Sequence, residues 1–159
     1  MRLKIVLLFL IVLSSCDKAI ESDTQVFQTE DLNYANTVLL EAVMEDAFSP
    51  PVASRIYSYS HIAHYVTLQS LRQNSLLGIT ELINDLEDFE AEPLEDVNPE
   101  LAALLAFSNI GKKLIYSEQF FDQLKDSVLN KAISLKLSAT TIKQSDVYAH
   151  NISKQLLIR

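Results

Sequence analysis

The sequence predicts an all-α protein: a helical bundle of about five helices that follows a cleaved lipoprotein signal peptide. Two observations favour this class. The 159 residues contain only two glycines and no tryptophan, and apolar side chains recur at spacings of three and four residues. That period is typical of helices that bury one face. Beyond its leader, the chain is long enough for one domain with a hydrophobic core.

The longest predicted helix covers residues 48–71, and its start signal is explicit. Ser49 suits the N-cap, where a hydroxyl can accept from first-turn amides, and Pro50 and Pro51 suit the first helical positions. A helix of about 20 residues spans roughly 30 Å, the width of a small domain. We therefore expect it to be the core helix, with an apolar face formed by Val52, Ile56, Tyr59, Ala63 and Val66.

A shorter helix is predicted before it, from Asp31, which can cap it, to Ala47. Its apolar face consists of Leu32, Ala35, Leu39 and Ala42. Because the next helix follows almost at once, we expect the two to form an antiparallel or sharply angled pair.

Three further helices are predicted in the second half of the chain. Asn98-Pro99-Glu100 starts one that reaches Tyr116, with Gly111 as a weak position. Ser117 can cap the next, which covers residues 118–137. Their apolar faces are Leu101, Leu104, Leu105 and Phe107 in the first, and Phe121, Leu124, Val128, Ala132 and Leu135 in the second.

The last helix is expected from Lys143, after an interruption at Ser138–Thr141. Its apolar stripe runs to the end of the sequence without a glycine cap or a polar tail. Such a stripe either packs back on the domain or indicates a partner, which would be a C-terminal catalytic half or another protein. The stripe consists of Val147, Ile152, Leu156 and Leu157.

The first 15 residues are typical of a signal peptide. Arg2 and Lys4 precede an apolar run over residues 5–13, which is too short to span a bilayer. Leu13-Ser14-Ser15-Cys16 has the pattern of a lipobox, which predicts Cys16 as the lipid attachment site; the alternative is an ordinary signal peptide with a chance cysteine. We expect residues 16–30 to form a lipidated tether and residues 31–159 the helical domain.

The charge balance limits the partners. Loss of residues 1–15 removes Arg2 and Lys4 and leaves 11 basic against 21 acidic residues, a net charge of −10. Such a chain lacks the basic footprint of a nucleic-acid-binding protein. It also lacks the charge for electrostatic attachment to anionic lipid. We therefore expect no nucleic acid partner, and a location in the bacterial cell envelope through the lipid anchor.

An acidic segment between residues 81 and 100 is a candidate calcium site, because carboxylate oxygens are calcium ligands. It contains no lysine or arginine, but it also lacks the ligand spacing and central glycine of an EF-hand. A solvated loop with a short helix is the favoured interpretation. The nine carboxylates are Glu81, Asp85, Glu87, Asp88, Glu90, Glu92, Glu95, Asp96 and Glu100.

Residues 48–65, FSPPVASRIYSYSHIAHY, resemble the N-terminal helical region of bacterial vanadium-dependent haloperoxidase-like proteins of the type 2 phosphatidic acid phosphatase superfamily. Weaker similarity continues through Asn98-Pro99, residues 102–107 and residues 145–152. The resemblance implies a vanadate- or phosphate-binding pocket built from three motifs: a lysine followed by Arg-Pro, then Pro-Ser-Gly-His, then Ser-Arg with a histidine six residues beyond the arginine. The first two motifs are absent from this sequence.

Ser54-Arg55 and His61 fit the third motif in spacing only. They precede any place for the other two motifs, Tyr65 stands where an aspartate would orient the histidine, and one continuous helix would put Arg55 and His61 about 120° apart. We therefore predict no catalytic residue and no cofactor in this chain; the vanadate or phosphate site would lie in a part that it does not contain.

His61 and His64 share a helix face, so a metal site is a further candidate. The sequence shows no third ligand nearby, and two histidines at a helix–helix boundary are the commoner arrangement, so we predict no metal site. Ser60 beside His61 is no nucleophile–base pair, because adjacent residues on a helix point apart.

The expected function is the N-terminal scaffold of a haloperoxidase- or phosphatase-like envelope lipoprotein, without activity by itself. The alternative is a stand-alone helical lipoprotein that binds a partner in the envelope. A small metal-dependent enzyme that uses His61 and His64 is a third possibility.

Overall fold

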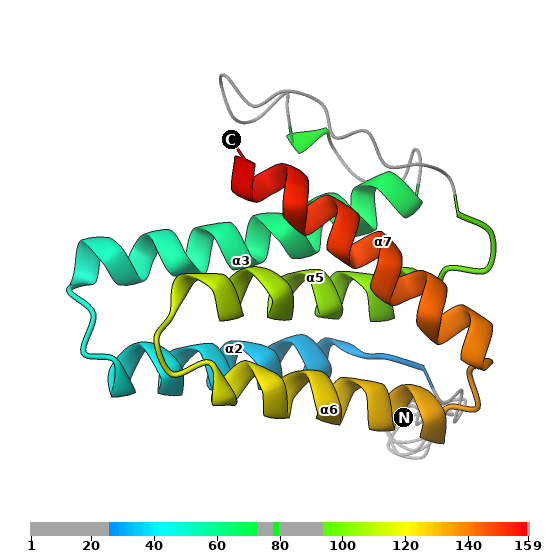
Figure 1. The fold of residues 1–159 in the computed structure, drawn as a ribbon, viewed down its shortest axis with the longest axis horizontal. Helices are drawn as coiled ribbons and strands as arrows, with labels where there is room; N and C mark the ends of the chain where they lie inside the picture. The colour runs from blue at the N-terminus through cyan, green and yellow to red at the C-terminus, as the bar shows by residue number, and fades with distance from the viewer. Residues whose placement is uncertain (1–25, 73–77, 80–93, 159) are drawn as a thin grey trace, which may run out of the picture.

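The computed structural model describes residues 26–72, 78–79 and 94–158, and these form five α-helices and no strand (Figure 1). The prediction of an all-α bundle of about five helices is confirmed. The predicted signal peptide, Cys16 and most of the acidic segment lie outside the described residues. The helices are α2 (Thr29–Glu45), α3 (Pro50–Leu71), α5 (Pro99–Leu114), α6 (Gln119–Ser134) and α7 (Ala139–Ile158).

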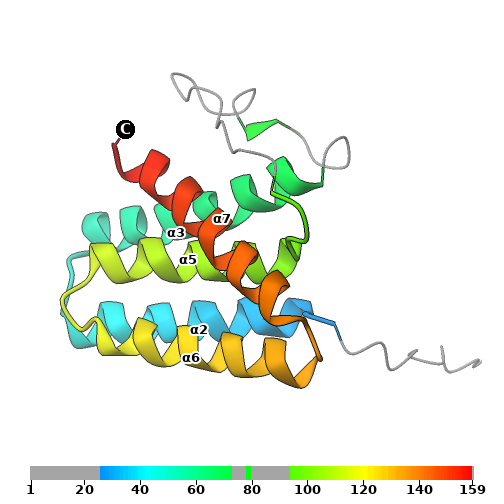
Figure 2. The same ribbon diagram turned by 45° about the vertical axis from the view of Figure 1, so that its right-hand side comes forward.

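Helix α5 is the centre of the bundle, and it packs against each of the other four described helices. Figures 1 and 2 show α2 and α6 side by side on one side of α5, α3 on the other, and α7 crossing α3 and α5 diagonally. Helices α2 and α3 run in opposite directions, as expected, but α2 packs against α5 and α6.

The prediction that residues 48–71 form the core helix is therefore wrong. In α5, every residue from Leu101 to Ser108 is buried, as are Ile110 and Gly111. A helix that is apolar on all sides belongs in the interior, and the run of alanines and leucines between residues 101 and 106 gives α5 that character.

The buried face of α3 also differs from the prediction. Ile56, Ala63 and Val66 are buried as expected, but Val52 and Tyr59 are 42% and 44% exposed. Ser60 and Thr67 are buried instead, because α3 meets α5 through small side chains. The Thr67 hydroxyl donates to the Ala63 carbonyl oxygen at 2.7 Å. The Ser60 hydroxyl is buried without a hydrogen bond in the described part of the chain.

Helix α2 begins at Thr29, two residues before the predicted start. Asp31 is not the N-cap: its carboxylate accepts from the backbone amide of Gln28 at 2.7 Å and so closes the first turn. Phe27 is only 8% exposed and belongs to the core. The helical part of the chain therefore begins before residue 31, and the tether predicted for residues 16–30 stays a prediction.

The two helices that begin with proline, α3 and α5, start where the sequence predicts. Pro50 and Pro51 open α3 with Ser49 at the N-cap, although the Ser49 side chain makes no capping bond and only its carbonyl oxygen accepts first-turn amides. Pro99 opens α5, and the Asn98 side chain caps it by accepting from the Leu101 amide at 2.9 Å.

The connections on either side of α6 correct two predictions. Ser117 does not cap α6; its hydroxyl donates to Asp46, and Glu118 holds the N-cap position. The predicted break at Ser138–Thr141 lies earlier in the structure, at residues 135–138. The Ser138 hydroxyl accepts from the Thr141 amide at 2.9 Å, which caps α7 and starts it at Ala139 rather than Lys143.

Helix α7 packs back on α5 and α3. Tyr148, Ile152 and Leu156 are buried, whereas Val147, Leu157 and Ile158 are 41%, 46% and 75% exposed. The predicted apolar stripe is thus divided between a face within the bundle and an exposed end. In the described part of the chain, no helix has the length and apolarity needed to cross a bilayer.

Candidate functional site

His61 and His64 of α3 were considered above as candidate metal ligands. In the structure, His61 makes a packing contact between three helices. Its Nε2 lies 3.2 Å from Asn36 Oδ1 on α2. Its ring meets Phe107 of α5 edge-on, with centroids 5.3 Å apart. Burial lowers the pKa of His61, so the neutral imidazole is favoured in this contact.

His64, almost one turn further along α3, lines a cavity of about 280 Å³. We call this the His64 cavity. Burial is the main cause that lowers the pKa of His64 to about 4, and the nearby His61 and Arg72 lower it further, so its ring is neutral at physiological pH. The other lining residues are Phe27, Gln28, Thr29, Leu32, Leu68, Arg72, Glu100 and Leu104.

The charged groups of the His64 cavity neutralise each other. Arg72, at the C-cap of α3, forms an ion pair with Glu100 in the first turn of α5. Phe27, Leu32, Leu68 and Leu104 provide apolar walls. The cavity therefore has no net charge and one neutral imidazole among its polar groups.

The structure does not bring Ser54, Arg55 and His61 together as a catalytic motif. Helix α3 is continuous from Pro50 to Leu71, so Arg55 and His61 leave it about 120° apart. Arg55 is exposed near the start of the helix. The Ser54 hydroxyl donates to the Pro51 carbonyl oxygen at 2.9 Å.

Among residues 26–72, 78–79 and 94–158, no three histidine, cysteine or acidic side chains gather to hold a metal ion. Of the acidic segment, Glu95, Asp96 and Glu100 are described. Glu100 pairs with Arg72, and Asp96 accepts from the Ser138 hydroxyl at 3.5 Å. The other six carboxylates lie outside the described residues, so the calcium interpretation stays untested.

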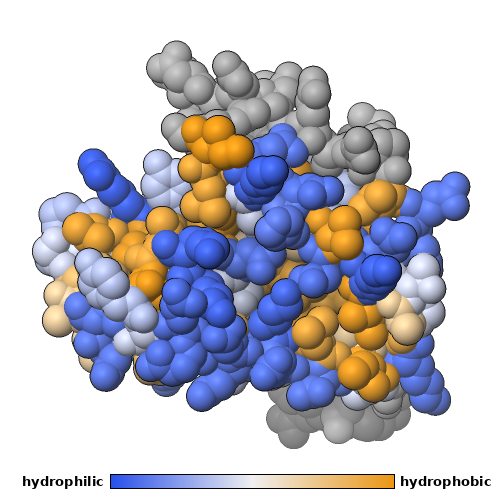
Figure 3. All heavy atoms as spheres, in the orientation of Figure 1, coloured by the Kyte–Doolittle hydropathy of each residue, from blue (hydrophilic) through white to orange (hydrophobic). Residues whose placement is uncertain are grey.

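A second hollow, of about 420 Å³, lies between α5 and α7, and we call it the α5–α7 groove. Figure 3 shows hydrophobic side chains at the C-terminal end of α7. Sequence reasoning missed this groove because its two sides are about 40 residues apart in the chain and meet only in the fold. It is lined by Asn109, Lys112, Lys113, His150, Ser153, Lys154, Leu157 and Ile158.

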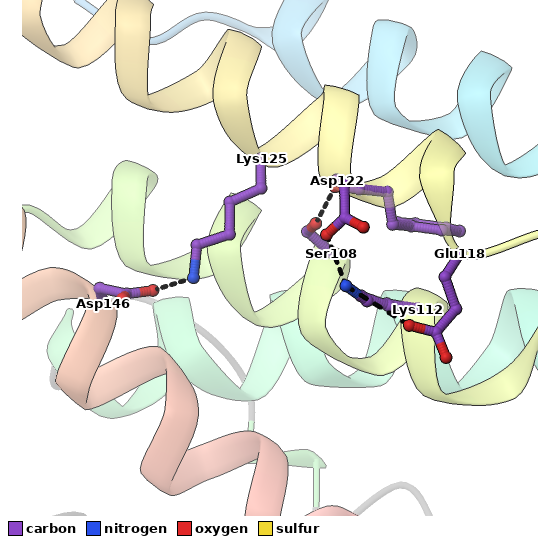
Figure 4. Close-up of polar contacts among 7 residues, drawn as sticks. Ser108, Lys112, Glu118, Asp122, Lys125 and Asp146 are labelled. Atoms are coloured by element: carbon purple, nitrogen blue, oxygen red, sulfur yellow. Dashed lines mark hydrogen bonds and ion pairs between the residues drawn. The ribbon is translucent and has the colours of Figure 1, made fainter.

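Lys112 already forms ion pairs with Asp122 of α6 and with Glu118, the residue just before α6 (Figure 4). Its Nζ lies 2.5 Å from Asp122 Oδ1 and 3.4 Å from Glu118 Oε2. The hydrogen bond with Asp122 is the main cause of the raised pKa of Lys112. A second ion pair, Lys125 with Asp146 at 2.7 Å, joins α6 to α7.

Neither hollow fits a vanadate or phosphate group. Such a site needs several cations fixed around the oxyanion, and a histidine. The His64 cavity has one cation, and Glu100 neutralises it. In the α5–α7 groove, two carboxylates hold Lys112, while Lys113, His150 and Lys154 are exposed. The oxyanion site that the family resemblance implies is therefore in neither of these two hollows.

No protein-family model matches the chain, and neither does any curated protein. Among solved structures, it is similar to one described as the crystal structure of the first bacterial vanadium-dependent iodoperoxidase, with a TM-score of 0.72 and 27% identity. The match covers 81% of this chain and 31% of the other, so this chain spans about a third of that structure's length. The helical fold of this chain is therefore haloperoxidase-like.

Proposed function

We propose that this chain is the N-terminal scaffold portion of a haloperoxidase- or phosphatase-like lipoprotein of the bacterial envelope, anchored through Cys16 and without activity by itself. The observation that carries the proposal is the difference in coverage: the structural match covers most of this chain but under a third of the iodoperoxidase. In this role the helices pack against a catalytic half and shape access to the vanadate or phosphate pocket that the other half supplies.

The exposed end of α7 supports a partner surface. Leu157 and Ile158 are exposed there, beside the exposed Lys113 and Lys154 of the α5–α7 groove. A contiguous apolar surface rimmed by polar groups is typical of an interaction site. We place the contact with the catalytic half at this end of the bundle.

The activity part of the proposal is tested with the full chain, orthovanadate, iodide and hydrogen peroxide, and separately with p-nitrophenyl phosphate. We expect no vanadate-dependent oxidation of iodide and no phosphate release above the rate without protein. Vanadate-dependent turnover that survives repurification would overturn the proposal. Lys154→Ala, with Lys143→Ala as a matched exposed control, would then show whether the α5–α7 groove holds the site.

A stand-alone binding module is the second candidate, because α7 buries Tyr148, Ile152 and Leu156 within the bundle. Thermal unfolding by circular dichroism with a dye for apolar surface separates the two. A sharp transition with little dye binding would favour the module and contradict the scaffold. Strong dye binding with a broad transition is the scaffold result.

Matched variants locate the exposed surface. If the end of α7 is the partner surface, the double variant Leu157→Glu/Ile158→Glu should lose most of the dye binding. Met44→Glu, which changes a residue of α2 that is 69% exposed, should keep it. Equal loss in both variants would contradict a partner surface on α7.

A further inference from the structure

The His64 cavity has the composition of a small-molecule site, which is independent of the proposed scaffold role. It lies where the start of α2, the end of α3 and the start of α5 converge. Sites of this kind have mostly apolar walls and a few polar groups that fix the ligand's orientation. Here four of the nine lining residues are large apolar side chains: Phe27, Leu32, Leu68 and Leu104.

The His64 imidazole is a polar group of this cavity without a hydrogen bond in the described part of the chain. No hydrogen bond to its ring nitrogens is formed within the described part of the chain, whereas His61 contacts Asn36. A neutral imidazole has one N–H donor and one acceptor nitrogen. Neither is taken up by a bond within the described part of the chain, so a ligand that enters the cavity can bond one of them in exchange for water.

The charges around His64 select against ionic ligands. An anion attracted by Arg72 would have to displace Glu100, and a cation attracted by Glu100 would have to displace Arg72. Apart from Arg72 and Glu100, no lining residue carries a charge, because the His64 imidazole is neutral. The cavity therefore favours a ligand without net charge.

The volume sets the size of the ligand. An engineered cavity of about 150 Å³ in another protein binds benzene, and sites for drug-sized molecules begin at about 300 Å³. A cavity of about 280 Å³ lies between these and suits a molecule of one or two rings.

We propose that the His64 cavity binds a small neutral molecule with an apolar body of one or two rings and a hydroxyl group. The hydroxyl donates to the free nitrogen of His64, and the rings lie between Leu32, Leu68 and Leu104.

The probe is 2-naphthol, titrated into the full chain and followed by ¹H–¹⁵N correlation NMR. Cell-free synthesis provides the chain with Cys16 unmodified. We expect saturable shifts for the amides of His64, Leu68 and Leu104, without matching shifts for Leu157. Shifts that centre on the α5–α7 groove, or that never saturate, would overturn the proposal.

Two comparisons test the hydrogen bond. His64→Leu should weaken 2-naphthol binding about five- to tenfold, the usual effect of losing one hydrogen bond, whereas His150→Leu, an exposed histidine of α7, should not. The ligand control is 2-methoxynaphthalene, which keeps the rings but cannot donate, and its affinity should be the same for the wild type and His64→Leu. Equal 2-naphthol affinity in the wild type and His64→Leu would contradict the proposal.

A third variant tests the cavity itself. Leu68→Phe adds volume to one wall and should abolish binding of both naphthalenes, while urea unfolding confirms that the protein is folded. Unchanged binding in a folded Leu68→Phe protein would place the ligand elsewhere.

Discussion

Gly111 of α5 lies directly against the ring of Phe121 of α6. A Cβ atom added at Gly111 would lie 2.2 Å from both Cε1 and Cζ of that ring. Phe121 is fully buried, and its ring also meets that of Phe107, with centroids 6.4 Å apart. The glycine that looked like a weak position in the sequence is therefore the place where α6 approaches α5.

Gly111→Ala should destabilise the protein. Alanine gains about 1 kcal/mol of helix propensity, but overpacking a filled core costs about 1–3 kcal/mol, and the fully buried Phe121 ring would have to shift to admit the methyl group. We expect a lower midpoint of urea unfolding. Phe121→Leu should restore part of it in the Gly111→Ala background, and an increase in stability with Gly111→Ala alone would contradict the close contact.

Ala47→Gly should stabilise the protein. Ala47, the second residue after α2, has a φ of 52°, a left-handed conformation that costs an L-residue about 1–2 kcal/mol and glycine little. Because glycine also has more freedom in the unfolded chain, we expect a net gain of about 0.5–1 kcal/mol in the free energy of unfolding. The control is Ala53→Gly inside α3, which should lose stability in the same urea experiment.

Asp46→Ala should separate the end of α2 from the α5–α6 connection. The carboxylate accepts from the Tyr116 amide at 2.7 Å and from the amide and hydroxyl of Ser117. Hydrogen bonds to a charged group contribute about 1.5–3 kcal/mol, so we expect a loss of about 2 kcal/mol in urea unfolding. Glu45→Ala removes the same charge from the neighbouring exposed residue and should change the free energy of unfolding by under about 0.5 kcal/mol.

The pH dependence of the Asp46 contribution has a definite sign. Partial burial acts to raise the pKa of Asp46, but the hydrogen bonds from Ser117 and from the Tyr116 amide outweigh it and lower the pKa below 3.8. The contribution is therefore present above pH 3.8 and is lost as the pH falls through the lowered value. The difference between wild type and Asp46→Ala should persist from pH 7 to pH 4.

His64 should make the protein less stable in mild acid. Its pKa falls from 6.5 to about 4 on folding, so between these pH values the unfolded chain binds more protons and stability falls as the pH falls. At 1.36 kcal/mol per pKa unit, the full effect is about 3 kcal/mol.

Urea unfolding of His64→Gln from pH 7 to pH 4 measures that effect. The variant should have a shallower decline than the wild type across this range. His150→Gln removes an exposed histidine and controls for the substitution. Parallel pH profiles for His64→Gln and the wild type would rule out a neutral, buried His64.

Helix positions could be predicted from the sequence, because proline and asparagine signals such as Asn98-Pro99 act locally. The choice of the central helix could not. The period of three and four residues in α3 indicates one apolar face, but it does not say how many helices surround a segment. The alanine-rich run from Leu101 to Ala106 was the available signal, and small side chains carry little weight in hydrophobicity patterns.

Hydrogen bonds between side chains that are far apart in the chain also could not be predicted from the sequence. Ser117 has the features of a local cap, yet it bonds Asp46, 71 positions earlier in the chain. The His64 cavity likewise needs three helices to meet at one end of the bundle. The sequence predicts that His61 and His64 share one helix face. Only the fold shows that His61 contacts Asn36 and that His64 lines a cavity.

The central position of α5 has a consequence for how the chain acquires its structure. Helices α2 and α3 come first in the chain, but α3 packs on α5 and α2 packs on α5 and α6, so their apolar faces stay unpaired until these later helices are present. Once formed, α5 is buried from Leu101 to Ser108, and the amide hydrogens of this stretch should exchange with solvent only when the helices around it separate. The slowest-exchanging amides of α5 should thus report the free energy of opening the bundle around it.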